Sequence, residues 1–326
     1  MSLTIDFWGV RGSLPFALTP SDLTKEFRAF MLRFFEVGHT NTKDIDLFIR
    51  SIGTPSLGGY GSSTTCVQVS SNHQSIIIDA GTGLKHLGDQ LMNGPAGKGD
   101  GTLHLFLTHF HWDHLIGLPS FYPAMVEGND INIYAVQSNV ESLIRNFLRH
   151  PWVETDIDSW KSRVNFHILQ PRIPITLNDM TITPYMMDHP DPCWGYRVSS
   201  GGKNYAHCAD TEATRVTAMS LGDDLPMYQN VDLMYFDAQY TLGELADRIN
   251  WGHSAAQIGL DLAFRESIKH VLFSHHDPIS TARDINQLVL QTEEYYRWKI
   301  NQAEKQKVVL PTVEWGFVYE GQRVRL

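Results

Sequence analysis

The sequence predicts an α/β protein: an αββα sandwich of two mixed β-sheets whose outer faces are covered by helices. Strand-like runs recur along the whole chain, many in adjacent pairs, and helical patterns are inserted late in each half. Such elements form stable domains as packed layers. The expected strands span residues 4–10, 64–70, 75–80, 102–108, 131–136, 164–169, 180–186, 194–199, 203–208, 231–236, 270–273 and 313–319. No internal repeat or linker divides the chain, so we expect a single domain over residues 1–326.

Composition narrows the class of protein. The chain has 326 residues, of which 42% are hydrophobic and 19% charged, and a formal net charge of −10. That charge argues against binding an extended nucleic acid, because phosphate neutralisation needs clustered Lys and Arg. No apolar run approaches the roughly 18–20 residues that span a bilayer, and the N-terminus does not resemble a signal peptide. Only 3 cysteines are present, so we expect a cytoplasmic protein without disulfides or membrane contact.

A helical insert is expected at about residues 18–55. Its apolar side chains recur at helical spacing, namely Leu23, Phe27, Phe30, Met31, Phe34 and Phe35. The simplest interpretation is a helix packed on the core. Alternatively the insert is a lid or the contact surface of a homodimer, because so much aromatic surface must be covered.

The hexapeptide His109-Phe110-His111-Trp112-Asp113-His114 is the strongest functional signal. It follows the apolar run 103–108, which reads as a buried strand ending in a loop. Imidazole and carboxylate groups are ligands for Zn²⁺ and related ions. A polar surface loop would seldom concentrate so many of them, so a metal site is the preferred interpretation.

Further ligands are expected at other strand ends, because one loop cannot hold two ions. A two-metal hydrolytic site places the ions roughly 3.5–4 Å apart with a shared ligand. His189, Asp210 and His275 each follow an apolar run, and His276 is a neighbouring alternative to His275.

With these residues in order, the chain resembles the metallo-β-lactamase-fold hydrolases. The HxHxDH hexapeptide, the later His189, Asp210 and His275, and the early strand-turn 76–83 all resemble that family's pattern, from about residue 9 to about 278. The resemblance implies the αββα metallo-β-lactamase fold. It also implies two bound divalent metal ions. Zn²⁺ is the preferred metal, and Mn²⁺ and Fe²⁺ are alternatives because they accept the same ligands.

The resemblance also divides the ligands between the ions. One metal is assigned to His109, His111 and His189. The other is assigned to Asp113, His114 and His275. Asp210 bridges them, and a water shared by both ions supplies hydroxide. The iron-binding redox branch has a carboxylate where this chain has His111, so the imidazole favours a hydrolase.

The segment 251–257 resembles the phosphodiesterase and RNase Z branch of the family. His253 corresponds to a histidine near the metals that is not itself a ligand, and it could stabilise phosphate oxygens or protonate the leaving group. Asp113 and His253 are therefore the expected catalytic residues, and Asp237 could orient His253. Alternatively, His253 merely caps or orients the helix that follows it, where Ser254 and Gln257 have capping-box spacing.

The expected activity is hydrolysis of a small anionic phosphodiester, such as a cyclic nucleotide or cyclic phosphate. The family's tRNA-processing enzymes carry a Gly/Pro-rich arm that we do not find between His114 and His275. Three alternatives stay open: a lactone, thioester or β-lactam hydrolase of the same fold, an RNase Z-like nuclease, and a metal-containing regulatory protein that binds a ligand without turnover.

Overall fold

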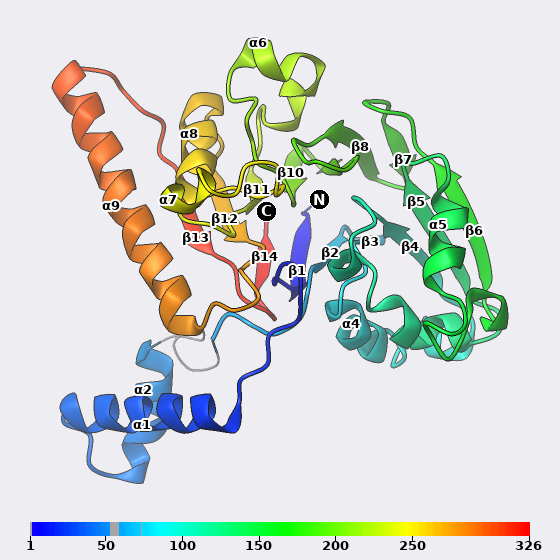
Figure 1. The fold of residues 1–326 in the computed structure, drawn as a ribbon, viewed down its shortest axis with the longest axis horizontal. Helices are drawn as coiled ribbons and strands as arrows, with labels where there is room; N and C mark the ends of the chain where they lie inside the picture. Colours follow the sequence, from blue (N-terminus) through cyan, green and yellow to red (C-terminus); the bar gives the residue numbers. More distant parts are fainter. Residues whose placement is uncertain (1, 53–58, 73) are drawn as a thin grey trace.

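Two seven-stranded sheets form the centre of the molecule in the computed structural model, which describes residues 2–52, 59–72 and 74–326 (Figure 1). The first sheet begins with antiparallel strands and continues with parallel ones. In order across the sheet its strands are β14 (Arg323–Arg325), β1 (Thr4–Gly9), β2 (Cys66–Ser70), β3 (Ser75–Ile78), β4 (Thr102–Phe106), β5 (Asp130–Ala135) and β6 (Arg163–Ile168).

The second sheet has the same construction, with four parallel strands followed by antiparallel ones. In order its strands are β13 (Glu314–Phe317), β12 (His270–Ser274), β11 (Leu233–Asp237), β10 (Lys203–Cys208), β9 (Trp194–Ser200), β8 (Met180–Met186) and β7 (Ile175–Leu177). The predicted fold class is therefore confirmed. The short edge strands β7 and β14 were not predicted, because three residues give too little alternation to recognise.

Side-chain alternation explains the layers. Ile76 and Ile78 belong to the cluster between the two sheets, whereas Ile77 belongs to the cluster under the helices, as the two-residue period of a strand requires. Phe7 and Tyr235, one from each sheet, stack with ring centroids 5.6 Å apart. The sandwich is thus held together by apolar side chains contributed from both sheets.

Helices cover both outer faces. On the first sheet these are α4 (Gly83–Leu91) and α5 (Val140–Phe147), and on the second α8 (Ala256–Glu266) and α9 (Ala282–Gln306). Two short helices, α6 (Ala218–Leu221) and α7 (Leu242–Leu245), lie in connections of the second half. In the described part of the chain, no helix has both the length and the apolar character to span a bilayer.

The insert forms two helices, α1 (Pro20–Glu36) and α2 (Ile45–Ile52), which lie at one end of the molecule beside the start of α9 (Figure 1). They pack on each other: the centroid of the Phe48 ring on α2 lies 5.1 Å from that of Phe30 and 5.3 Å from that of Phe34, both on α1. The remaining apolar stripe does not pack on the core, and Phe27 is 70% exposed. The simple core-helix interpretation is wrong for most of this stripe, because the helices extend away from the sandwich. The last predicted insert residues, 53–55, lie outside the described residues.

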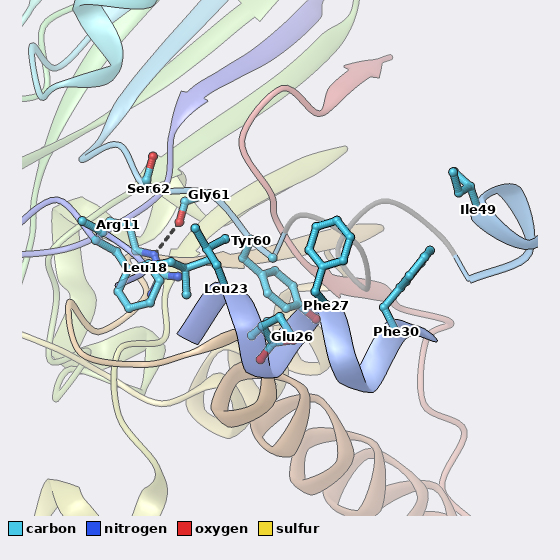
Figure 2. Close-up of a pocket in the computed structure, with 14 residues that line it drawn as sticks. Arg11, Leu18, Leu23, Glu26, Phe27, Phe30, Ile49, Tyr60, Gly61 and Ser62 are labelled. Atoms are coloured by element: carbon cyan, nitrogen blue, oxygen red, sulfur yellow. Dashed lines mark hydrogen bonds between the residues drawn. The ribbon is translucent and has the colours of Figure 1, made fainter. Parts of the chain in front are cut away.

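A cavity of about 710 Å³ separates α1 from the body of the protein (Figure 2). Leu23, Phe27 and Phe30 line it from α1, and Tyr60 and Gly61 line it from the body. Whether the insert acts as a lid or as a dimer contact stays a prediction.

Arg11 joins the two sheets at the end where the predicted ligands lie. The chain at this position bridges Thr64 on one side and His276 on the other. The guanidinium is buried and donates to the carbonyls of Gly61, Asp277 and Ser280 at 2.7–3.0 Å. Burial lowers the pKa of Arg11 to about 10, so the side chain stays charged at neutral pH.

We expect Arg11→Ala to lower the free energy of unfolding by about 3 kcal/mol, because it leaves buried carbonyls without donors and opens a cavity. Urea unfolding followed by circular dichroism measures this loss. Arg149→Ala, which changes an exposed arginine, is the control and should shift the midpoint little. An equal midpoint for both variants would contradict the structural role of Arg11.

Candidate metal centre

The predicted ligands converge because they follow strands that end at the same edge of the sandwich. The hexapeptide 109–114 follows β4 of the first sheet, while Asp210 and His275 follow β10 and β12 of the second. His189 follows β8. Ligands come from both sheets, so the site depends on the packing of the sandwich.

Backbone conformation aims several of these side chains. Asp210 and His275 have positive φ angles of 51° and 59°, in the left-handed region that non-glycine residues seldom adopt. Asp79, after β3, has a φ of 63°. Such residues persist where the surrounding structure compensates their strain, and they concentrate at functional sites.

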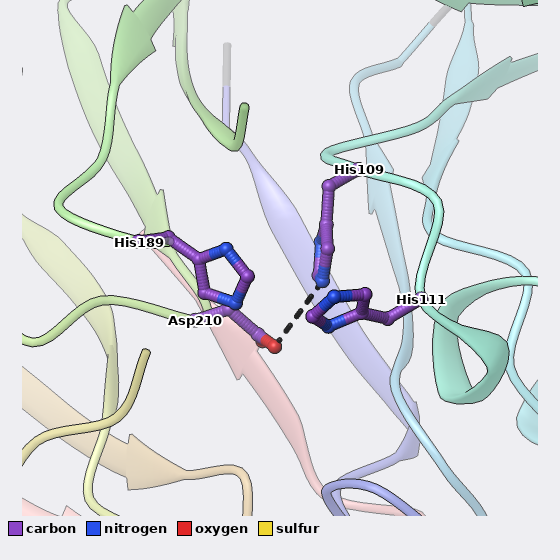
Figure 3. A group of neighbouring side chains, drawn as sticks. All are labelled: His109, His111, His189 and Asp210. Carbon is purple, nitrogen blue, oxygen red and sulfur yellow. Dashed lines mark ion pairs between the residues drawn. The ribbon is translucent and has the colours of Figure 1, made fainter. Parts of the chain in front are cut away.

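One group contains His109, His111, His189 and Asp210, whose ligand atoms lie within 4.8 Å of one another (Figure 3). His109 Nε2 lies 3.5 Å from Asp210 Oδ2. The His189 ring centroid is 4.9 Å from the His109 and the His111 centroids. The structure therefore brings together the three histidines predicted for one metal with the predicted bridging aspartate.

A second group contains Asp113, His114, His275 and the same Asp210. Asp210 Oδ1 lies 3.0 Å from His275 Nε2 and 3.2 Å from His114 Nε2. Asp113 Oδ2 lies 3.2 Å from His275 Nε2 and 3.4 Å from His114 Nε2. Asp210 thus belongs to both groups, with one oxygen facing each.

Unpartnered atoms test whether these residues fit metal ions. Among the candidate ligands, four side chains have buried atoms for which the described residues provide no hydrogen-bond partner: Nε2 of His109, His114 and His189, and both carboxylate oxygens of Asp210. Buried polar atoms are normally satisfied, because leaving one unpaired costs about 1–3 kcal/mol. A set of N and O donors, all facing one space, fits divalent cations of the Zn²⁺ type.

The opposite ring nitrogens are held by hydrogen bonds. His114 Nδ1 lies 2.8 Å from Asp79 Oδ2, and His275 Nδ1 lies 2.9 Å from Gln239 Oε1. His111 Nε2 lies 2.9 Å from Asp191 Oδ2, which leaves Nδ1 for the first group. Partners of this kind fix the orientation and tautomer of metal-binding histidines.

Electrostatics keep the carboxylates ionised. Burial alone would raise the pKa values of Asp113 and Asp210, but His114 and His275 lower both well below the usual aspartate range. Burial opposes charge on His275 as well, yet Asp210 and Asp113 raise its pKa to about 9. Protons on these histidines would have to leave when a cation binds, so binding is coupled to proton release.

The structure also separates His275 from its neighbour. His276 points to the other side, where Nε2 donates to the carbonyl of Val318 at 2.8 Å and the ring lies against Phe317. His276 belongs to none of the three potential metal groups found in the described residues. The geometry therefore favours His275 as the ligand.

His253 lies beside the second group without joining it. Its ring stacks on His275 with centroids 4.7 Å apart, and its Nδ1 lies 2.8 Å from Asp237 Oδ2. Asp237, His253 and His275 also form a third potential metal group. However, both ring nitrogens of His275 are already engaged: Nε2 faces Asp113 and Asp210, and Nδ1 faces Gln239. His275 therefore has no nitrogen left for a metal ion in this third group.

The predicted capping box at Ser254 is wrong. Helix α8 begins at Ala256 with Ala255 as its N-cap and no side-chain cap. The Ser254 hydroxyl instead donates to the carbonyl of Glu212 at 3.4 Å. A role for His253 in simply capping the helix is therefore not supported, since its imidazole is bound to Asp237.

Two glycines allow the backbone to approach the candidate ligands. A Cβ on Gly252, which has a φ of 87°, would lie 2.2 Å from Cδ2 of His189. A Cβ on Gly12 would lie 2.2 Å from Nδ1 of His275. The next residue, Ser13, donates its amide to Asp113 Oδ2 at 2.7 Å. The entry segment 11–13 and the segment before α8 thus both lie against the site.

Sequence reasoning missed the residues that orient the ligands. Asp79 lies within the family-like turn 76–83, and no sequence motif marks Gln239 or Asp191. Their roles depend on contacts across 35, 36 and 80 positions of the chain, respectively. The positive φ of Asp79 is also a tertiary feature with no local signal.

Comparison with known proteins agrees with this geometry. A family model described as "Beta-lactamase superfamily domain" matches residues 74–276. The chain belongs to this superfamily. The match covers the candidate ligands from His109 to His275.

One curated relative is a ribonuclease Z from Prochlorococcus marinus (strain AS9601), 29% identical over 156 residues. This alignment spans 47% of the chain and 48% of the relative, so the chain covers about half of that protein's length.

Solved structures share the whole fold. The metallo-β-lactamase fold protein YhfI from Bacillus subtilis is 16% identical, with a TM-score of 0.64 over 100% of this chain and 99% of that one. Unliganded yeast PDE1 is 13% identical, with a TM-score of 0.61 over 99% of each chain. Both likenesses show the metallo-β-lactamase fold.

We expect Asp210→Asn to reduce bound Zn²⁺ from about two ions per chain to fewer than one, because it removes the carboxylate common to both groups. Equilibrium dialysis followed by elemental analysis measures the metal content. Asp89→Asn changes an exposed aspartate on α4 and is the control. Full metal content in Asp210→Asn would contradict the shared-ligand assignment.

Gly252→Ala should weaken Zn²⁺ binding about 10- to 100-fold, because the added Cβ displaces His189 and such orienting contacts have effects of this size. Competition with a chromophoric chelator measures the affinity. Gly202→Ala is a matched control: it has a similar φ of 79° but no atom within 4 Å of the added Cβ. If Gly252→Ala binds Zn²⁺ as tightly as Gly202→Ala does, the close approach of Gly252 to His189 does not position this ligand.

Proposed function

We propose that this protein is a metal-dependent hydrolase that cleaves a small phosphodiester, such as a cyclic nucleotide or cyclic phosphate. The observation that carries the proposal is the His253–Asp237 pair, held against His275 at the edge of two clusters of metal-type ligands, one buried and one partly buried. A hydrolase acting on a phosphodiester needs both charge stabilisation at phosphorus and a proton donor for the leaving alkoxide.

Seven side chains would hold two divalent ions. They are His109, His111, Asp113, His114, His189, Asp210 and His275. When bound, the ions would act as Lewis acids toward the phosphoryl group and lower the pKa of water to near neutrality. Zn²⁺ suits these ligands best, and Mn²⁺ or Fe²⁺ accept the same donors.

The chain's own residues would do the remaining work. Asp237 accepts a hydrogen bond from His253 Nδ1, which fixes the tautomer and leaves Nε2 for proton exchange with the substrate. Asp237 also accepts the amides of Thr211, Gln239 and Ser254, so its position is determined by three backbone segments. His253 is 8% exposed, which limits the access of bulk water to the proton it would transfer.

Asp113 has a double role in this proposal. Its carboxylate would bind one metal while it accepts the amide of Ser13, which ties the entry segment to the centre.

Two further observations support a small phosphodiester. A ribonuclease, the named class of the curated relative, cleaves phosphodiester bonds. The net charge of −10 disfavours a long polyanionic chain more than a small anion, which local cations can neutralise.

We expect His253→Gln to lower kcat for adenosine 3′,5′-cyclic phosphate by about 10²–10⁴-fold, because it removes the proton donor but keeps the size of the side chain. The loss should be at least about tenfold smaller with bis(p-nitrophenyl) phosphate, whose leaving group departs without protonation. Steady-state rates of the Zn²⁺- or Mn²⁺-loaded protein measure both effects.

His86→Gln, an exposed histidine on α4, is the control. Unchanged rates in His253→Gln would contradict the proton-transfer role. Turnover of lactones, thioesters or β-lactams without turnover of any phosphodiester would overturn the proposed substrate class.

A further inference from the structure

A cavity of about 790 Å³ lies beside the metal-binding loop, with Trp112 of that loop in its lining. One wall is the turn after β4, with Trp112, Ile116 and Pro119, and the other is the end of α5 and the segment that follows it, with Phe147 and Trp152. Its volume lies within the range of small-molecule sites.

Two tryptophans give the cavity an unusual lining. Trp112 is 64% exposed and Trp152 is 73% exposed, although both side chains contribute to the same hollow. Large aromatic side chains usually bury most of their surface, because each offers 150–250 Å² of apolar area. Two of them left open on one cavity indicate a site for a flat apolar or aromatic group.

The cavity and the candidate metal centre share the loop 109–114. Trp112 lies between the proposed ligands His111 and Asp113, in a turn closed by hydrogen bonds from the amides of Leu115 and Ile116 to the Trp112 carbonyl. Trp152 is held by a hydrogen bond from its amide to the carbonyl of Arg149 at 2.9 Å. One wall of the cavity therefore belongs to the same loop as four of the candidate ligands.

The polar groups of the cavity select a neutral ring and not a phosphate. Glu154 adds a carboxylate, and Ser120, Asn146 and Thr155 add neutral donors and acceptors. None of the described residues that line it is Lys, Arg or His. A carboxylate accepts amino and imino hydrogens of a base, and it repels the phosphate that the cations of the centre would attract.

We propose that this cavity binds the nucleobase of the substrate, stacked on Trp112 and Trp152. The inference rests on the proposed phosphodiesterase function and adds the class of substituent that the substrate carries. It predicts a preference for nucleoside phosphodiesters over phosphodiesters that lack a base.

The test compares two esters that break the same bond. The p-nitrophenyl ester of thymidine 5′-phosphate and methyl p-nitrophenyl phosphate share a leaving group and differ in the nucleoside. Base stacking on an aromatic side chain is worth about 1–3 kcal/mol, or roughly 5- to 150-fold. Trp152→Ala should therefore lower kcat/KM for the thymidine ester about 10- to 100-fold more than for the methyl ester.

Two variants control for other effects. Trp152→Phe keeps an aromatic face and should restore most of the preference. Trp298→Ala removes another half-exposed tryptophan, on α9 and outside this cavity, and should retain the preference. An equal loss on both esters in Trp152→Ala would overturn the inference and assign Trp152 a general structural role.

A binding measurement separates this inference from the proposed function. Thymidine and adenosine, which have no phosphate, should bind the wild-type protein and quench its tryptophan fluorescence, and Trp152→Ala should bind them at least about fivefold more weakly. If neither ester is cleaved but the nucleosides bind in this way, the proposed function fails and the base site stands. If both esters are cleaved but neither nucleoside binds saturably, the function stands and the base site is wrong.

Discussion

The buried carboxylate of Asp210 is the feature on which the rest of the site depends. It lies between two groups of ligands, with one oxygen facing His109 and the other facing His114 and His275. An ionised group this deep is stable only when opposite charges surround it, because the interior does not solvate it. The histidines provide that charge when protonated, and divalent ions would provide it more strongly. The cost of burying Asp210 is thus offset by the groups that make the centre reactive.

The sandwich supplies the geometry that this carboxylate requires. Strands of both sheets end at one edge, so loops that are far apart in sequence meet there, and the chain at Arg11 joins the two sheets at the same place. Left-handed turns at Asp210 and His275 then direct the side chains inward. Because the interior is close-packed, a shift of the first sheet would move four of the seven candidate ligands, and a shift of the second sheet would move the other three. A change that disturbs the packing of the two sheets would therefore also displace the candidate ligands.

The segments around this centre differ in how closely they contact the candidate ligands. The entry segment 11–13 contacts Asp113 and His275, the segment before α8 contacts His189, and Trp112 opens onto a separate cavity. The α1–α2 insert, in contrast, packs mainly on itself and exposes Phe27. The entry segment, the segment before α8 and Trp112 lie beside the candidate ligands without belonging to them. They are the parts of the chain where substrate preference can vary while the chemistry is preserved.

The sequence by itself determined the layered fold and the identity of the candidate ligands. Strand alternation and the spacing of the hexapeptide are local patterns, and the ligands after the later strands follow from an apolar run ending in a polar residue. Only the tertiary structure decided which residue of the His275–His276 pair faces Asp210. Both are histidines at the end of the same strand, so the sequence pattern cannot show which side chain points to the site. The tertiary structure also decided the supporting contacts of Asp79, Asp191 and Gln239, the loss of the expected cap at Ser254, and the placement of Trp112 and Trp152 on one cavity. Each of these depends on segments distant in the chain, and a contact between distant segments leaves no periodic signal in the sequence.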